Sequence, residues 1–271
     1  MPALGIVGVA ALLYWLGGRR RVSGRHGHEQ TGRTIAFVLS LVAIVVALVG
    51  PLDDLADQLF LAHMAQHVLL LSVAPPLLVV SAPWARMWQP LPLGLRRAVA
   101  RGLAVSPRTR WVRAAAHGVA HPLAAWTLAS VTLVVWHLPA AYDLTLRNGA
   151  VHELEHTLFF LTAVLFWGAV IDSPPFRSRL DWPQRIAFTV SGMLVGWVLS
   201  VVLAFATNPL YAPYAALARR PGGLSALADQ RIAAGVMWVP GSLAFSIAIV
   251  VFVYRWLDPA PTRRRLGLAG H

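Results

Sequence analysis

The sequence contains no cysteine, no lysine and only three glutamates among its 271 residues. The absence of cysteine excludes disulfides, thiolate metal ligands and thiol nucleophiles. The absence of lysine means that all 23 basic residues are arginines. Charged residues make up only 13% of the chain and hydrophobic residues 57%. This balance predicts a membrane protein and not an ordinary soluble domain.

Long apolar segments recur along the whole chain. A helix of about 20 mostly apolar residues crosses a hydrocarbon core about 30 Å thick. Seven segments of this kind occur, at 2–18, 33–51, 56–82, 121–139, 150–171, 185–206 and 229–257. We therefore expect an all-α fold, with residues 1–271 forming a single domain of seven transmembrane helices. The first segment has no basic region before it and no small-residue cleavage site after it, so we expect a retained helix and not a signal peptide.

The formal net charge of +12 could indicate a nucleic-acid partner or an anionic membrane surface. The arginines are concentrated after the first, third and fifth segments and at the C-terminus, whereas the second connection, PLDDLAD, has none. By the positive-inside rule the N-terminus is outside and the C-terminus is in the cytoplasm. Topology thus explains the charge, and we expect lipid but no nucleic acid as a partner.

The third connection, residues 83–120, is predicted to be a basic, amphipathic cytoplasmic segment. Its stretch LGLRRAVARGL places Leu95, Val99 and Leu103 on one helical face and arginines on another, which is typical of a helix lying on the inner leaflet. Ser106 and Pro107 predict the N-cap and first residue of a second short helix. A solvated basic loop is the alternative for either piece.

Five of the ten histidines share a depth near the outer side of the predicted bundle. His63 and His67 lie four residues apart in the third segment, His152 and His156 have the same spacing in the fifth, and His137 ends the fourth. Residues four apart share a helical face, and ionisable residues in membrane segments usually face the protein interior. The pattern predicts one metal site built from these five side chains.

Other candidates rank below these histidines. Asp229 and Met237 lie toward the same end of the seventh segment and are less certain ligands, with helix-start stabilisation and core packing as the alternatives. His117 and His121 also have four-residue spacing, but at the cytoplasmic end of the fourth segment. Interfacial packing is favoured there over metal binding.

The stretch VHELEH fits the H-E-x-x-H signature of zinc metalloproteases, with Glu153 as the general base. A catalytic zinc needs an open coordination position, which five imidazoles could fill, and no LDG or NPDG motif follows on a later helix. We therefore expect no enzyme and keep an intramembrane zinc protease as the minor alternative. Glu153 and Glu155 are expected to orient imidazoles by accepting their ring N–H groups.

The metal is not fixed by these residues. Imidazole suits zinc, copper, iron and nickel, and copper binds most tightly among divalent first-row ions. Haem is a further alternative, because two helices could each offer one axial histidine.

Several separated motifs resemble those of the bacterial cytochrome c oxidase assembly factor CtaG family, of the seven-helix type. They are HMAQHVLLLSVAPPLLVVSAP, WHLPAAYDLTL, HELEHTLFF, SPPFRSRLDWPQR and DQRIAAGVMWVPG. The chain does not resemble the unrelated copper chaperone of the same name, which has one membrane helix and a cysteine-bearing domain. The matching motifs contain the five histidines, Asp229, Gln230, Met237 and Trp238.

This resemblance implies a multi-pass protein of the bacterial inner membrane that assists maturation of a haem-copper oxidase. The implied cargo is copper for the CuB centre; zinc is the alternative metal that the histidines themselves allow. The implied partners are the catalytic subunit of the oxidase and a periplasmic or extracellular copper donor.

Overall fold

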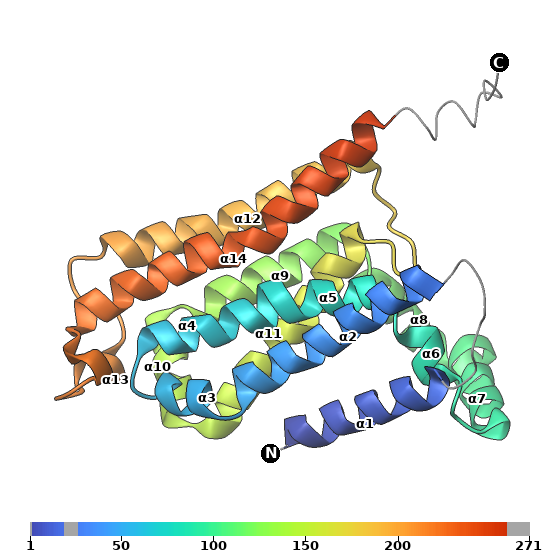
Figure 1. Ribbon diagram of the computed structural model, residues 1–271, viewed down its shortest axis with the longest axis horizontal. Helices are drawn as coiled ribbons and strands as arrows, with labels where there is room; N and C mark the ends of the chain where they lie inside the picture. The colour runs from blue at the N-terminus through green and yellow to red at the C-terminus, as the bar shows by residue number, and fades with distance from the viewer. Residues whose placement is uncertain (1, 19–26, 259–271) are drawn as a thin grey trace.

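The computed structural model describes residues 2–18 and 27–258. Within these ranges every regular element is a helix, and extended pairing is limited to an isolated bridge between Ser173 and Phe176 (Figure 1). The all-α prediction is therefore confirmed. The arginines at 19–25 and 263–265, which helped to predict the topology, lie outside the described residues, and the orientation of the termini stays a prediction.

Five described helices, counting α4, η1 and α5 as one, are long and apolar enough to cross a membrane. They are α2 (Gly27–Leu48), the continuous run α4 (Phe60–Val68), η1 (Leu69–Val73) and α5 (Ala74–Ser81), α11 (Gly149–Val170), α12 (Trp182–Phe205), and α14 (Ala226–Leu257). A sixth arises if α9 (Pro122–Trp136) is joined to the helical segment before it across a 73° bend. The remaining predicted segment is α1 (Pro2–Gly18), which is apolar but shorter. All seven predicted segments are thus helical, although seven full spans are not confirmed.

The long helices form two layers (Figure 1). Helices α12 and α14 run side by side, and α14 also packs on α4. The run α4–η1–α5 lies between α2 and α11, and α9 packs on α11. One buried cluster joins α4, α10, α12, α13 and α14 around Phe60 and Tyr142, and a second surrounds Trp167. The first cluster lies at the end of the molecule where the predicted metal site belongs.

The η1 turn is a π-helix caused by the prolines that follow it. Pro75 and Pro76 have no N–H, so the carbonyl of Leu71 has no helical donor either four or five residues later. The indole Nε1 of Trp167 on α11 donates to this carbonyl at 3.0 Å. The proline pair therefore produces both the π turn and a tie between two membrane helices.

Short helices close the end of the bundle that carries the histidines. Gly50 adopts φ +91°, a conformation that favours glycine, and leads into α3 (Pro51–Ala56). Helix α10 (Pro139–Arg147) follows α9, and α13 (Ala212–Ala215) follows α12. Asn148 then caps α11 by accepting the N–H of Ala150 at 3.0 Å. These pieces cover the buried cluster around Phe60.

The connection at 83–120 is helical, as its sequence predicts. It contains α6 (Trp84–Trp88), α7 (Leu93–Ala100), η2 (Arg101–Val105), η3 (Pro107–Thr109) and α8 (Arg110–Val119). The Ser106 hydroxyl accepts the N–H of Arg108 at 3.3 Å, which confirms the predicted cap. Leu95 and Leu103 are about half exposed, at 48% and 51%. Contact of these side chains with the inner leaflet stays a prediction.

Candidate metal site

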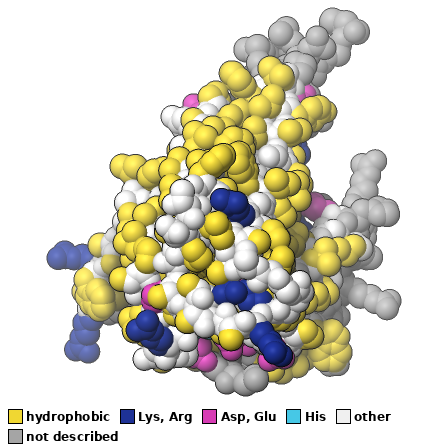
Figure 2. Space-filling view, turned by 90° about the vertical axis from the view of Figure 1, so that its left-hand side faces the viewer, with side chains coloured by type: hydrophobic (Ala, Val, Ile, Leu, Met, Phe, Trp, Pro, Cys, Tyr) yellow, Lys and Arg dark blue, Asp and Glu magenta, His cyan; other side chains and the backbone are white. Residues whose placement is uncertain are grey.

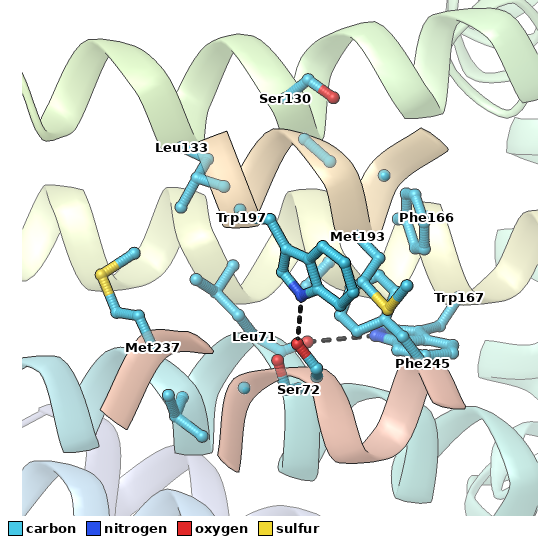
Figure 3. A pocket seen from close by; sticks show the side chains of 17 residues that line it. Leu71, Ser72, Ser130, Leu133, Phe166, Trp167, Met193, Trp197, Met237 and Phe245 are labelled. Carbon is cyan, nitrogen blue, oxygen red and sulfur yellow. Dashed lines mark hydrogen bonds between the residues drawn. The ribbon is translucent and has the colours of Figure 1, made fainter. Parts of the chain in front are cut away.

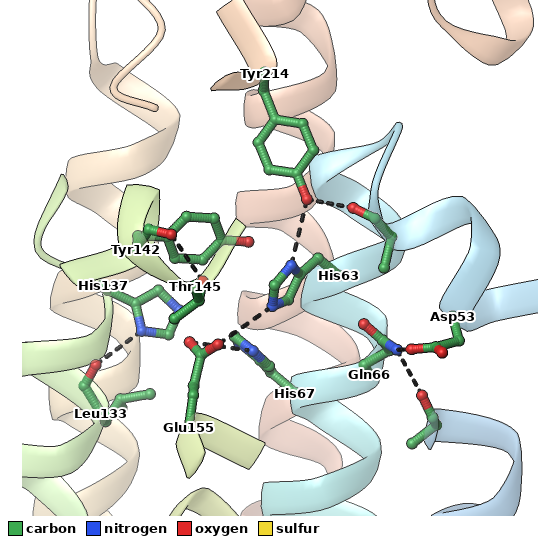
Figure 4. Close-up of polar contacts among 12 residues, drawn as sticks. Asp53, His63, Gln66, His67, Leu133, His137, Tyr142, Thr145, Glu155 and Tyr214 are labelled. Atoms are coloured by element: carbon green, nitrogen blue, oxygen red, sulfur yellow. Dashed lines mark hydrogen bonds and ion pairs between the residues drawn. The ribbon is translucent and has the colours of Figure 1, made fainter. Parts of the chain in front are cut away.

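Four side chains from two membrane helices converge on one point in the structure (Figure 4 shows three of them). Helix α4 contributes His63 and His67, and α11 contributes Glu155 and His156. One ligand atom from each residue lies within 4.8 Å of the others, and all four residues are buried. Ligand atoms around a tetrahedral ion at about 2.1 Å are about 3.4 Å apart, so modest side-chain movement would enclose a metal.

Glu155 lies between the two histidines of α4. Its oxygens are 3.7 Å from His63 Nε2 and 3.6 Å from His67 Nε2, which is too long for hydrogen bonds. These two nitrogens and both carboxylate oxygens have no hydrogen-bond partner, although all are buried. A buried polar group without a partner costs about 1–3 kcal/mol. A metal ion bound by these atoms would satisfy all of them at once, so the residues present fit a metal.

The hydrogen bonds around His63 place its ring proton on Nδ1 and leave Nε2 free to bind a metal. The Tyr214 hydroxyl donates to the carbonyl of Ala56 and lies 3.3 Å from His63 Nδ1. Burial raises the pKa of Tyr214 well above its ordinary value, so its single proton stays in place. The oxygen must therefore accept from His63 Nδ1–H, which leaves the lone pair of Nε2 facing Glu155.

A hydrogen bond fixes the ring tautomer of His137 in the same way. Its Nδ1 lies 2.8 Å from the carbonyl oxygen of Leu133, which can only accept, so Nδ1 carries the proton. Its Nε2 is buried without a partner, and its ring centroid is 5.4 Å from that of His67. His137 thus lies directly beside the four converging residues.

His152 lies closer to the surface than the four converging residues. Its ring centroid is 4.2 Å from that of His156 and 4.9 Å from that of His63. The structure therefore brings all five predicted histidines together, three of them within the tightest group. From here on, the histidine cluster means these five residues, His63, His67, His137, His152 and His156, together with Glu155.

Asp229 occupies a different position from the four converging residues. Its two oxygens accept the backbone N–H groups of Phe60 at 2.8 Å and Leu61 at 3.0 Å, at the start of α4. The side chain therefore caps the helix that carries His63 and His67. The sequence suggested stabilisation of the start of Asp229's own helix as the alternative to metal binding, but the structure shows both oxygens capping α4 instead.

Met237 lines an apolar cavity of about 90 Å³ between the membrane helices (Figure 3). Met193 and Leu133 share this cavity, and Leu133 is the residue whose carbonyl holds His137. The indole of Trp197 donates to the Ser242 hydroxyl at 2.6 Å along its wall. Met237 therefore lies in an apolar setting and packs against the buried cluster around Phe60 and Tyr142.

The two glutamates of HELEH have opposite environments. Glu153 is exposed, whereas Glu155 is fully buried among the histidines. A zinc protease would need Glu153, the motif glutamate, beside the metal, so the structure disfavours that alternative. Convergence of several ligands on one point also suits a single ion better than haem, which takes axial ligands on opposite faces of a plane.

His117 and His121 lie away from the cluster. His117 Nε2 accepts a hydrogen bond from Arg179 at 2.7 Å, and His121 precedes α9 as its N-cap residue. Both side chains are exposed, and interfacial packing stays a prediction.

Two neighbours of the cluster are not apparent from sequence spacing. Tyr214 lies 151 residues after His63, and no local pattern connects them. Thr145 lies on α10 near Glu155 in Figure 4, and its hydroxyl donates to the carbonyl of Tyr142 at 2.7 Å. Its motif WHLPAAYDLTL gives only the family resemblance as a signal.

The fold and the site define a polytopic, all-helical membrane protein with a buried cluster of histidines and one carboxylate. A family model described as cytochrome c oxidase caa3 assembly factor (Caa3_CtaG) matches residues 12–258, so the chain belongs to this family. The family assignment confirms the resemblance seen in the sequence motifs. Its assembly role supports the prediction of a non-enzymatic protein.

Uncharacterized proteins of Mycobacterium bovis and Mycobacterium tuberculosis are each 25% identical over 259 residues, and one of Mycobacterium leprae is 25% identical over 260. The match covers 93% of this chain but only 38% of each mycobacterial protein. No solved structure matches the chain significantly.

Proposed function

We propose that this protein supports assembly of a haem-copper cytochrome c oxidase by holding copper in the histidine cluster and supplying it for the CuB centre. The observation that carries the proposal is the convergence of His63, His67, His156 and Glu155, with unpartnered ligand atoms, inside membrane helices. Imidazole nitrogen is a good ligand for copper. The catalytic subunit of the oxidase would receive the ion within the bacterial inner membrane.

Charge balance favours a monovalent ion at this site. Three neutral imidazoles and the Glu155 carboxylate carry one negative charge, which a cuprous ion would neutralise. A divalent ion would leave one positive charge among fully buried side chains, which is unfavourable. Zinc remains the alternative metal, because three nitrogens and one oxygen also suit its tetrahedral geometry.

The test combines metal analysis with oxidase composition. The host bacterium lacking the gene would be complemented with the wild type, the His63→Ala/His67→Ala variant, or His117→Ala as a control that removes a histidine outside the cluster. Purified oxidase would be analysed for copper relative to haem, and the purified assembly factor for copper and zinc.

We expect oxidase with haem but depleted copper in the deletion strain and in the double variant, and normal copper with His117→Ala. The double variant should itself carry no copper. Fully loaded oxidase in cells that hold only the double variant would disprove the proposed role. Zinc without copper in the wild type would reassign the metal.

A further inference from the structure

His152 differs from the other members of the histidine cluster in its exposure. The other four imidazoles are between 0% and 6% exposed, whereas His152 is only partly buried. Its Nε2 has no hydrogen-bond partner. Behind it, His156 is 6% exposed and its Nε2 is also without a partner. Two unpaired, buried nitrogens therefore follow one another, one on the partly exposed His152 and one on the buried His156.

Three carboxylates act electrostatically on His152, namely those of Asp53, Asp57 and Glu153. They come from separate elements: Asp53 lies on α3, Asp57 follows that helix and Glu153 lies on α11. Asp57 and Glu153 are exposed, while Asp53 accepts a hydrogen bond from Gln66 at 2.9 Å. Figure 2, which views this end of the molecule, shows acidic side chains gathered along its lower edge.

Arginines also lie at this end of the molecule (Figure 2). Arg147, Arg219, Arg220 and Arg231 are distributed over α10, the segment after α13 and α14. Arg220 is tied to the backbone carbonyl of Tyr214. A cation approaching His152 therefore passes the exposed carboxylates of Asp57 and Glu153.

We propose that Asp57, Glu153 and His152 form the entrance through which a metal cation reaches the histidine cluster. This inference rests on the proposed function. The two exposed carboxylates raise the local concentration of cations, as charged clefts do. His152 Nε2 then binds the ion and passes it to His156, whose ring centroid is 4.2 Å away. Each transfer exchanges one imidazole ligand for another, so the charge of the ion does not change.

A route through the apolar cavity of Figure 3 is the competing path. Met193 and Met237 line it and could relay a soft ion as thioethers. The walls of that cavity are mostly apolar, so a hydrated cation would lose its water without compensation there. The His152 route offers charge at the surface and nitrogen ligands at each step.

Loading kinetics distinguish the two routes. The full chain would be placed in uncharged phosphatidylcholine nanodiscs and mixed with cuprous ion in a weak, coloured chelator whose absorbance reports transfer. The entrance variant is Asp57→Asn/Glu153→Gln, and His152→Ala removes the first ligand. Glu29→Gln is the control, because it removes an exposed acidic charge at the start of α2, the end of that helix farther from α3 and the entrance.

We expect the entrance variant to load about tenfold more slowly at low salt and to reach the same final copper content as the wild type. The difference should vanish at high salt, because the Debye length falls from about 30 Å at 0.01 M to about 3 Å at 1 M. His152→Ala should load slowly at both salt concentrations. The control should match the wild type.

Equal rates for the wild type and the entrance variant would overturn the inference, as would equal slowing in the control. If Met193→Leu/Met237→Leu slowed copper loading and the entrance variant did not, the path would be assigned to the cavity. In each of these cases copper still binds, so the proposed function survives. If the wild type takes up no copper, the proposed function fails and the inference fails with it.

Discussion

The carboxylate of Asp229 accepts the backbone N–H of Phe60 at 2.8 Å, across 169 residues of sequence. Helix α14 thereby supplies the N-terminal cap of the helix that carries His63 and His67. The next residue, Gln230, makes a similar tie, because its amide accepts from Leu210 N–H at 2.8 Å and donates to a backbone carbonyl of α12.

Replacing Asp229 with alanine should lower the free energy of unfolding by about 3 kcal/mol, because two buried N–H groups lose a charged acceptor. Thermal unfolding in detergent would measure the change. Arg231→Gln, an exposed change two residues further along α14, should stay within about 0.5 kcal/mol of the wild type. Loss of copper from Asp229→Ala without any change in thermal stability would contradict the capping role and favour the ligand alternative.

Glu155→Gln should weaken copper binding by about 10–100-fold or more, because the only carboxylate of the histidine cluster is removed. Glu153→Gln should leave the equilibrium affinity unchanged, since that side chain is exposed. Competition with a chelator of known affinity would measure both. If Glu153→Gln weakened copper binding and Glu155→Gln did not, the protease-like arrangement, in which the motif glutamate acts at the metal, would be correct.

Trp167→Phe should destabilise the protein by about 1–2 kcal/mol more than Trp126→Phe. Both changes remove an indole N–H, but that of Trp167 donates to the orphaned carbonyl of Leu71, whereas that of Trp126 has no partner. Chemical unfolding in detergent would measure the difference. Adding Pro75→Ala to Trp167→Phe should recover part of the loss, because alanine supplies the missing helical N–H. Equal losses for the two tryptophan variants would show that the bond to Leu71 contributes nothing.

The ion pair between Asp172 and Arg185 predicts a pH dependence of stability. Burial alone would raise the pKa of Asp172, but hydrogen bonds from Arg185, at 3.0 and 3.2 Å, and from Ser178 N–H lower it below its ordinary value. A lowered pKa contributes stability above the unfolded value, near pH 4, and the contribution is lost as the pH falls through the folded value.

Melting temperatures between about pH 6 and pH 3 should therefore fall less steeply in Asp172→Asn than in the wild type. The effect is small, since the Asp172 side chain is 47% exposed and solvent screens the pair. Asp54→Asn, which removes an exposed charge from α3, should keep the wild-type slope. Identical slopes in all three proteins would show that the ion pair does not stabilise the fold.

Hydropathy predicted most long helices to within a few residues, because apolar runs are the main signal of a membrane helix. The segment predicted at 150–171 is α11 (Gly149–Val170), and that at 229–257 is α14 (Ala226–Leu257). The prediction of the segment at 56–82 was less accurate at its start, because one helix ends at Ala56 and the next begins at Phe60. That break depends on the distant Asp229 cap, which no local pattern contains.

Spacing also predicted that the histidines face one another, but not which glutamate joins them. Glu155 follows His152 by three residues, and Glu153 precedes His156 by three, so the helical pattern is symmetric. Only the position of α4 decides that Glu155 is buried and Glu153 exposed. The contribution of Tyr214 is likewise a property of the tertiary packing.

The π turn at Leu69–Val73 determines the direction in which the side chains of α4 point relative to those of α5. A π turn adds one residue to an α-helix, and each residue advances the direction of side chains by about 100°. Deleting one residue from this turn would therefore rotate His63 and His67 by about 100° relative to α5, away from Glu155. The span would still cross the bilayer with almost the same length and hydropathy. A single inserted residue thus decides whether α4 presents its histidines to α11.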